Sequence, residues 1–278
     1  MISDFVYSRK ELDKVILPLV KKIVKKYNPG KTVIVGISGG QGTGKSCLAE
    51  FVKEDIKVAG YNVTSFSIDD FYNTFKQRKN LARKLGGNPF YQISRGMPGT
   101  HRVKMLEKVL QRAKKGKSLI IPKFDKSLHS AWGGISKEKL KINKKQDFII
   151  LEGWCLGMPY LSSKKFIDFC KKKKFDLKWI DPGLVSHKEV LKQSRSYLKL
   201  WKLIDYMVLL KADSLDLHEK WRYQQEFELK QKTGKGMSKE EIYNFVNVYL
   251  PFTLLCSEKV KSNVKIMINK KHEFYEIK

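Results

Sequence analysis

The sequence predicts an α/β protein with three layers, in which a mostly parallel central sheet carries helices on both faces. Short β-branched runs alternate with longer stretches of helical periodicity, and this order is typical of strand–helix–strand units. Hydrophobic residues make up 42% of the 278 residues, which is enough for the core of one large domain. We therefore expect a single domain over residues 1–278, with an N-terminal helical extension (1–30), a helical insertion (157–203), and lid and C-terminal helices (213–256).

Each expected element follows from its own pattern. Apolar residues at helical spacing predict a helix over residues 9–27, which ends at Asn28-Pro29-Gly30. Short runs rich in Val and Ile predict strands at 32–38, 63–68, 118–121, 147–151, 205–211 and 264–268. Further helices are expected over 45–59, 75–85, 102–115, 215–232 and 238–256, and 160–203 is predicted to be mostly helical with a break at 181–183. Gly and Pro are dense between residues 86 and 99, which favours a binding loop over a linker.

The sequence shows no targeting or membrane segment. No apolar run approaches the roughly 18 residues that a membrane span needs. Because a secretory signal requires an apolar stretch and a cleavage site, and neither is present, we expect the mature protein to begin at or near Met1. The four cysteines are irregularly spaced, which argues against a zinc site or a disulfide framework and favours a reducing, cytoplasmic setting. They are Cys47, Cys155, Cys170 and Cys256.

The formal net charge of +28 suggests two classes of partner, nucleic acids and small anions. Only eight of the 56 basic residues are arginine, whereas nucleic-acid surfaces usually add arginine and stacked aromatic residues. The lysine runs at 114–117 and 171–174 lie near predicted helix ends, where cations complement the helix dipole. We therefore expect a mostly solvated basic surface that attracts small anionic substrates.

The strongest motif lies between the expected strand at 32–38 and the expected helix at 45–59. Its residues are Gly39, Gly40, Gln41, Gly42, Thr43, Gly44, Lys45 and Ser46. They match G-x-x-x-x-G-K-[ST], a loop whose backbone N–H groups approach a phosphate chain while the following helix adds its positive dipole end. Lys45 is expected to neutralise the β- and γ-phosphates of ATP, and the Ser46 hydroxyl to ligate Mg²⁺. The motif specifies the expected fold as a P-loop NTPase fold.

Two further expected strands end in carboxylates. Asp69 and Asp70 follow the strand at 63–68, and Glu152 follows the strand at 147–151. Because the carboxyl ends of parallel strands line the active cleft of such a sheet, Asp69 is expected to accept a proton from an attacking hydroxyl. Asp70 and Glu152 are expected to contact Mg²⁺ or its water. Acids at strand exits also cap helices, and the sequence leaves that alternative open.

Two weaker segments complete the set of candidate motifs. Residues 95–101 place an arginine and a histidine on a Gly- and Pro-rich loop that could grip an anion, and residues 122–127 place two lysines around an acid after a strand. Taken alone, residues 95–101 suit an ordinary structural loop equally well, and residues 122–127 favour an ordinary surface turn.

Together these segments resemble the glycerate 3-kinase family, a branch of the P-loop kinases that also contains uridine kinase, phosphoribulokinase and pantothenate kinase. The resemblance covers most of the chain. It rests on GGQGTGKS (39–46), SIDDFY (67–72), RGMPGTH (95–101), PKFDKS (122–127), ILEGW (150–154), WRYQQE (221–226), GKGMS (234–238) and FVNVYLPF (245–252). Only the first of these is generic to P-loop proteins.

The resemblance implies transfer of the γ-phosphate of ATP to D-glycerate, giving 3-phosphoglycerate and ADP. It assigns Asp69 the role of base and Lys45 a catalytic role, and it implies a monomer or weak homodimer. Substrate contacts are expected from Tyr72, Arg95, His101, Lys123, Asp125 and Lys126. Arg222 and Gln225 lie on a helix that resembles the mobile lid of the family.

Two departures from the family pattern leave the acceptor open. Arg102 stands where the family carries an acid, and residues 127–136 lack the usual Gly-x-Gly-Asp-Arg stretch. A related kinase with a uridine-, pantothenate- or sugar-like acceptor is therefore an alternative. A basic nucleic-acid-associated ATPase is an alternative of a different class, although the strand at 148–151 lacks the Asp-Glu pair usual in nucleic-acid motors.

Overall fold

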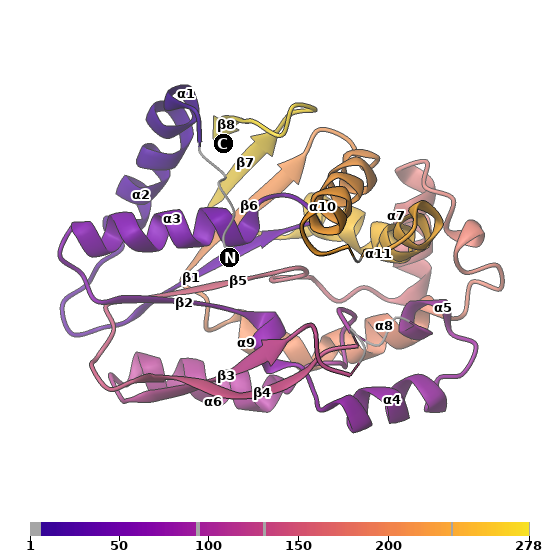
Figure 1. Ribbon diagram of the computed structural model, residues 1–278, viewed down its shortest axis with the longest axis horizontal. Coiled ribbons are helices and arrows are strands. Elements are labelled where there is room, and N and C mark those ends of the chain that lie inside the picture. The colour runs from indigo at the N-terminus through magenta and orange to yellow at the C-terminus, as the bar shows by residue number, and fades with distance from the viewer. Residues whose placement is uncertain (1–6, 93–94, 130–131, 235, 278) are drawn as a thin grey trace.

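A six-stranded sheet forms the centre of the molecule (Figure 1). The computed structural model describes residues 7–92, 95–129, 132–234 and 236–277. The strand order is β2 (Val63–Ser67), β5 (Phe148–Gly153), β1 (Val33–Gly39), β6 (Tyr206–Ala212), β7 (Val264–Ile268) and β8 (Phe274–Ile277). Neighbouring strands run parallel except β8, which pairs antiparallel with β7. The predicted mostly parallel sheet is confirmed.

Alternate residues of the strands pack into two separate apolar clusters on opposite faces of the sheet. Val33, Val35 and Ile37 of β1 pack with helices α2 (Leu17–Val24) and α3 (Lys45–Val58), whereas Ile34 packs into the cluster on the other face. That second cluster includes α6 (Val103–Lys114). Figure 1 shows α2 and α3 on one side of the sheet and α6 on the other. The expected three-layer α/β fold is therefore confirmed.

Most of the remaining helices lie in predicted helical segments, whereas η2 (Ile68–Phe71) and α5 (Pro89–Gln92) lie in segments that were not predicted to be helical. The N-terminal helical segment is continuous through α1 (Arg9–Glu11), a π-helical turn η1 (Leu12–Ile16) and α2. The others are α4 (Phe75–Lys84), α7 (Ser163–Lys172), η3 (Leu177–Trp179), α8 (His187–Ser194), η4 (Arg195–Tyr197), α9 (Leu198–Trp201), α10 (Leu217–Thr233) and α11 (Lys239–Lys259). None of the described helices is long and apolar enough to cross a membrane.

The strand predicted at 118–121 does not join the central sheet. It extends as β3 (Leu119–Asp125) and pairs antiparallel with β4 (Gly134–Ile142) in a separate two-stranded sheet. Strand β4 was not predicted, because its middle residues are charged and exposed and lack an apolar face. The residues expected to form a loop after the strand, 122–125, therefore lie within β3.

A buried row of polar side chains fastens the helical segment 157–203. The Asp181 carboxylate, 1% exposed, accepts hydrogen bonds from the backbone N–H groups of Val185, Ser186 and His187. Its second oxygen lies 2.7 Å from His187 Nδ1, and His187 Nε2 lies 2.7 Å from Ser163 Oγ. Although burial opposes ionisation, the donated hydrogen bonds lower the pKa of Asp181. The row joins the start of α7 to the start of α8, so the two helices are held as one unit.

Candidate active site

The phosphate-binding loop connects the end of β1 at Gly39 to the start of α3 at Lys45. Within the loop, the Thr43 hydroxyl and the Lys45 ammonium both donate to the carbonyl of Gly40, at 2.8 and 2.6 Å. Gly42 and Gly44 have φ angles of +74° and +78°, a region in which side chains other than glycine are strained. The sequence thus folds this segment into a tight turn whose lysine already lies over the loop.

Three charged groups surround the mouth of this loop. Burial lowers the pKa of Lys45, while Glu152 and Asp69 act to raise it. Burial raises the pKa of Glu152, which lies at the end of β5 and is 8% exposed, while Lys45 acts to lower it. The ammonium and the two carboxylates therefore interact across one partly desolvated space, where electrostatic interactions are stronger than in water.

Asp69 faces this space as an ionised carboxylate. Burial acts to raise its pKa, but Lys126, His101 and Tyr72 outweigh that effect and hold the pKa below its usual value. The Lys126 ammonium lies 3.5 Å from the Asp69 carboxylate and is largely exposed. A carboxylate that stays deprotonated in a pocket can accept a proton at neutral pH.

Asp70 is positioned differently although it borders the same cavity. Its carboxylate accepts hydrogen bonds from the backbone N–H groups of Ser67 and Phe124, both at 3.2 Å, and from the Lys123 ammonium at 3.3 Å. With Ser67 it forms the capping box of η2. Both oxygens of Asp70 are therefore engaged in joining η2 to β3, which corresponds to the capping alternative that the sequence left open.

Aromatic and cationic side chains also line the cavity. The His101 ring stacks on Tyr72 with centroids 4.4 Å apart, and burial lowers the pKa of His101 to about 4, so the ring is neutral. Arg95 Nη1 and Arg222 Nε are buried without a hydrogen-bond partner within the described chain. Tyr249 donates to the Arg95 carbonyl at 2.5 Å, which fixes the backbone beside the unpaired guanidinium. Unpaired buried donors of this kind mark a site for an anionic ligand.

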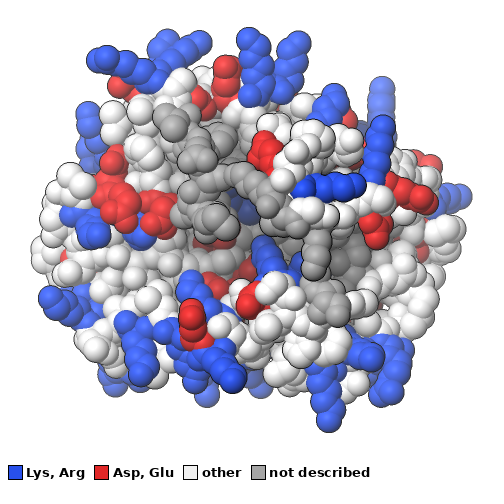
Figure 2. All heavy atoms as spheres, viewed as in Figure 1, with Lys and Arg blue, Asp and Glu red and all other residues white. Residues whose placement is uncertain are grey.

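One cavity of about 400 Å³ brings most of the predicted residues together. Its lining includes the predicted residues Gln41, Gly42, Gly44, Lys45, Ser46, Asp69, Asp70, Tyr72, Arg95, His101, Lys126, Glu152, Arg222 and Gln225. In Figure 2 basic and acidic side chains meet around a hollow, and the other lysines and arginines are spread along the rim of this face.

Two predicted substrate contacts lie outside the lining of this cavity. Lys123 pairs with Asp70, and the Asp125 carboxylate accepts hydrogen bonds from the backbone N–H and hydroxyl of Ser127, at 2.8 and 2.6 Å. Asp125 thus caps its own turn. The cavity also includes Phe124, Phe245 and Tyr249, which the sequence did not single out as site residues.

The two departures from the family pattern lie in different places. Gly133 packs closely beside Arg95, because a Cβ at Gly133 would lie 2.8 Å from Arg95 Nη1. Arg102 precedes α6 as its N-cap residue and lines a separate cavity together with His101. Gly133 thus lies beside an arginine of the site cavity, and Arg102 lies at a second cavity that His101 also lines; residues 130–131 are outside the described chain.

The predicted lid helix α10 begins directly on the phosphate-binding loop. His218 Nδ1 lies 2.8 Å from the Gln41 carbonyl oxygen, and the Trp221 ring stacks on His272 with centroids 4.4 Å apart. Farther along α10, Arg222 forms an ion pair with Glu226, and its guanidinium lies 5.2 Å from the centre of the Phe245 ring. The base of α10 is thus packed on the loop, with Arg222 at the cavity edge.

Comparisons with known proteins agree with this site. No protein-family model matches the chain. The chain is 34% identical to the uncharacterized kinase mug58 of Schizosaccharomyces pombe over 251 residues, which cover 86% of this chain and 87% of that protein. It is 30% identical to the chloroplastic D-glycerate 3-kinase of Arabidopsis thaliana over 79% of this chain and 46% of that protein. The solved structure of D-glycerate 3-kinase from Cryptococcus neoformans var. grubii has a TM-score of 0.81 at 26% identity, covering 95% of this chain and 96% of that one.

The fold, the phosphate-binding loop and these relatives define a P-loop phosphotransferase. The chain belongs to the same family of kinases as mug58, and D-glycerate 3-kinases are among the proteins that it resembles.

Proposed function

We propose that this protein transfers the γ-phosphate of ATP to the primary hydroxyl of a small hydroxy acid, with D-glycerate as the first candidate acceptor. One observation carries the proposal: ionised Asp69 lines the same cavity as the phosphate-binding loop and as Arg95 and Arg222, whose Nη1 and Nε atoms are buried without a hydrogen-bond partner among the described residues. A carboxylate on the acceptor suits an arginine, which can bind it with two parallel hydrogen bonds.

The residues present fit ATP and Mg²⁺. The loop offers a lysine and closely curled backbone, and Ser46 and Glu152 provide oxygen atoms beside it. Mg²⁺ prefers oxygen ligands and is usually held by one or two carboxylates together with substrate phosphates. We propose Ser46 and Glu152 as the protein residues nearest the ion, whereas the hydrogen bonds of Asp70 favour a structural role. When bound, the ion would neutralise charge on the phosphate chain.

Asp69 would take the proton of the acceptor hydroxyl as that oxygen forms its bond to the γ-phosphorus. The bond between the γ-phosphorus and the β–γ bridging oxygen breaks, and ADP leaves with that oxygen. Lys45, which now donates to the Gly40 carbonyl, would turn to the phosphates and stabilise their charge. Arg222 stands at the cavity edge, where its guanidinium would meet the transferring phosphoryl group.

A related kinase with a different hydroxyl acceptor is the second candidate. The observation that favours it is that Gly133, within the segment that departs from the family pattern, lies close to Arg95. A change there would alter the pocket around the acceptor while leaving the phosphate-binding loop as it is.

A coupled assay of ADP release that offers D-glycerate, uridine and pantothenate in parallel tests the proposal. We expect turnover with D-glycerate and none with the other two alcohols. Turnover of uridine or pantothenate without turnover of D-glycerate would favour the second candidate. If ATP binds and none of the hydroxy acids is phosphorylated, the proposed acceptor class is wrong.

A further inference from the structure

His101, which lines the acceptor cavity, carries a polar atom whose role the site has not yet explained. The residue is 6% exposed, its ring stacks on Tyr72, and its Nε2 is buried with no hydrogen-bond partner in the described part of the chain. A buried ring nitrogen without a partner is costly unless a ligand satisfies it. What Nε2 can offer depends on whether it carries the proton of the neutral imidazole.

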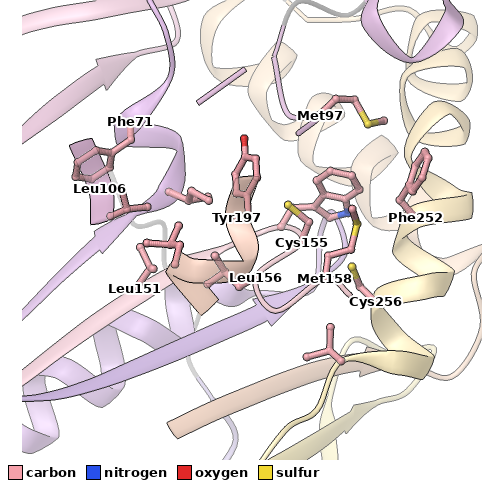
Figure 3. Packing of buried hydrophobic residues seen from close by; sticks show 14 of the residues in the cluster. Phe71, Met97, Leu106, Leu151, Cys155, Leu156, Met158, Tyr197, Phe252 and Cys256 are labelled. Carbon is pink, nitrogen blue, oxygen red and sulfur yellow. The ribbon is translucent and has the colours of Figure 1, made fainter. Parts of the chain in front are cut away.

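The other ring nitrogen, Nδ1, contacts the phenol of Tyr197. Nδ1 lies 2.9 Å from the Tyr197 oxygen, and the two rings meet edge to face with centroids 5.9 Å apart. Tyr197 belongs to the helical segment 157–203, far from His101 in sequence, and is 1% exposed. Figure 3 shows it within the apolar cluster that also contains Leu151, Cys155 and Leu156. The phenol is therefore fixed in place and has few alternative partners.

The hydrogen bonds of the Tyr197 phenol determine which ring nitrogen of His101 is protonated. The Tyr197 oxygen accepts a hydrogen bond from the Gly99 N–H at 3.0 Å, and a second hydrogen-bond contact of that oxygen among the described residues is with His101 Nδ1. Burial raises the pKa of Tyr197 well above its ordinary value, so the phenol keeps its proton. A backbone N–H can only donate, so Nδ1 is the acceptor within reach of the phenol proton.

We propose that Tyr197 is a positioning residue that holds neutral His101 in the tautomer protonated at Nε2, so that His101 donates a hydrogen bond to an oxygen of the acceptor substrate. The identity of that acceptor rests on the proposed function, whereas the tautomer of His101 does not depend on it. In this tautomer His101 cannot serve as a base, which leaves proton abstraction to Asp69. It also gives the helical segment 157–203 a role in the site: through Tyr197 it sets the hydrogen-bonding character of the pocket wall.

The tautomer can be measured directly, without substrate. We would record long-range ¹H–¹⁵N spectra of the full chain labelled with ¹⁵N-histidine at neutral pH, and assign His101 by the signals lost in His101→Gln. We expect a neutral ring protonated at Nε2. A ring protonated at Nδ1, or a doubly protonated ring, would overturn the proposal whatever the acceptor proves to be.

Matched variants test the role of Tyr197. Tyr197→Phe removes the donor to Nδ1, and Tyr91→Phe is the control, because the Tyr91 hydroxyl donates to Pro98 of the same loop at 2.9 Å without contacting His101. We expect Tyr197→Phe to disturb the tautomer and to raise the KM for the acceptor roughly 3- to 10-fold, the loss of one neutral hydrogen bond. The KM for ATP should stay unchanged, and Tyr91→Phe should match the wild type in both measurements. An unchanged tautomer and acceptor KM in folded Tyr197→Phe would refute the inference.

A second pair keeps the test decisive if Tyr197→Phe fails to fold. His101→Gln retains an N–H donor near the position of Nε2, whereas His101→Ala does not. We expect His101→Gln to lose less acceptor affinity than His101→Ala. Equal losses in the two variants would show that a donor at this position contributes nothing, and would also refute the proposal.

Discussion

The neighbouring carboxylates Asp69 and Asp70 should separate into a chemical and a structural role. In Asp69→Asn the base is lost, and kcat should fall about 10²- to 10⁴-fold, the usual contribution of general base catalysis. Stability should fall only slightly, because the pocket favours the Asp69 charge but its Lys126 partner is largely exposed, and the amide keeps an acceptor oxygen. ATP binding should be retained, since the phosphate-binding loop is untouched.

Asp70→Asn should give the opposite result, a loss of stability with transfer largely retained. Its carboxylate satisfies two backbone N–H groups, and an asparagine oxygen can satisfy only one of them, which leaves a buried donor unpaired at a cost of about 1–3 kcal/mol. The lost pair with Lys123 adds little, because that ammonium is 41% exposed. A total of about 2 kcal/mol corresponds to a drop in Tm of about 4–8 °C. Transfer should remain within about 10-fold of the wild type, since the Asp69 base is intact.

The two variants are compared by ADP release with saturating ATP and D-glycerate, by ADP binding, and by thermal melting. Because the substitutions are chemically identical and one residue apart, each variant is the control for the other. If Asp70→Asn abolishes transfer at an unchanged Tm, Asp70 acts in catalysis and the assignment based on its hydrogen bonds is wrong.

Three further predictions follow from the described contacts. Asp181→Ala removes a buried carboxylate that accepts four hydrogen bonds. It should lower the free energy of unfolding by about 3–5 kcal/mol in denaturant titrations. Retained stability would contradict the role of Asp181 in joining α7 to α8. Because the pKa of Asp181 is lowered in the folded protein, its contribution is present at neutral pH and lost as pH falls through that pKa, so the wild type should lose more stability on acidification than Asp181→Ala. Because the pKa of His101 is about 4 and that of Asp69 is lowered, neither group should reduce kcat/KM as the pH falls from 8 to about 6. If kcat/KM instead rises with increasing pH around a midpoint near 6.5, His101 is charged in the free enzyme at lower pH.

The central fold could be predicted from the sequence largely because the middle strands β1, β5 and β6 are buried on both faces. Continuous Val- and Ile-rich runs such as β1 and β5 distinguish themselves from amphipathic helices, and the phosphate-binding loop fixes how the first strand meets its helix. Only β3 of the β3–β4 sheet was predicted, since the middle of β4 is exposed and the strand is rich in lysine. β8 is a four-residue strand with no comparable run.

The candidate site was predictable wherever a residue acts within a local motif. Asp69, Glu152 and the loop at 39–46 lie at strand ends, and strand ends can be found from the sequence. The roles of Asp70 and Asp125 depend on hydrogen bonds that only the fold supplies: Asp70 on the backbone of β3, and Asp125 on the turn that it caps. Tyr197 and Tyr249 reach the 95–101 loop from segments about 100 and 150 residues away, as their hydrogen-bonding pairs show. No local pattern marks such residues.

The contact between α10 and the phosphate-binding loop limits which substitutions the loop can accept. Gly40 occupies a position that the general phosphate-loop pattern leaves free, yet a Cβ there would lie 2.2 Å from Cε1 of His218. Its glycine is therefore required by the neighbouring helix and is not explained by phosphate binding alone. Residues 40 and 218 should therefore vary together: a larger side chain at 40 should be accepted only together with a smaller one at 218. A library randomised at both positions should recover such pairs and few single changes at 40.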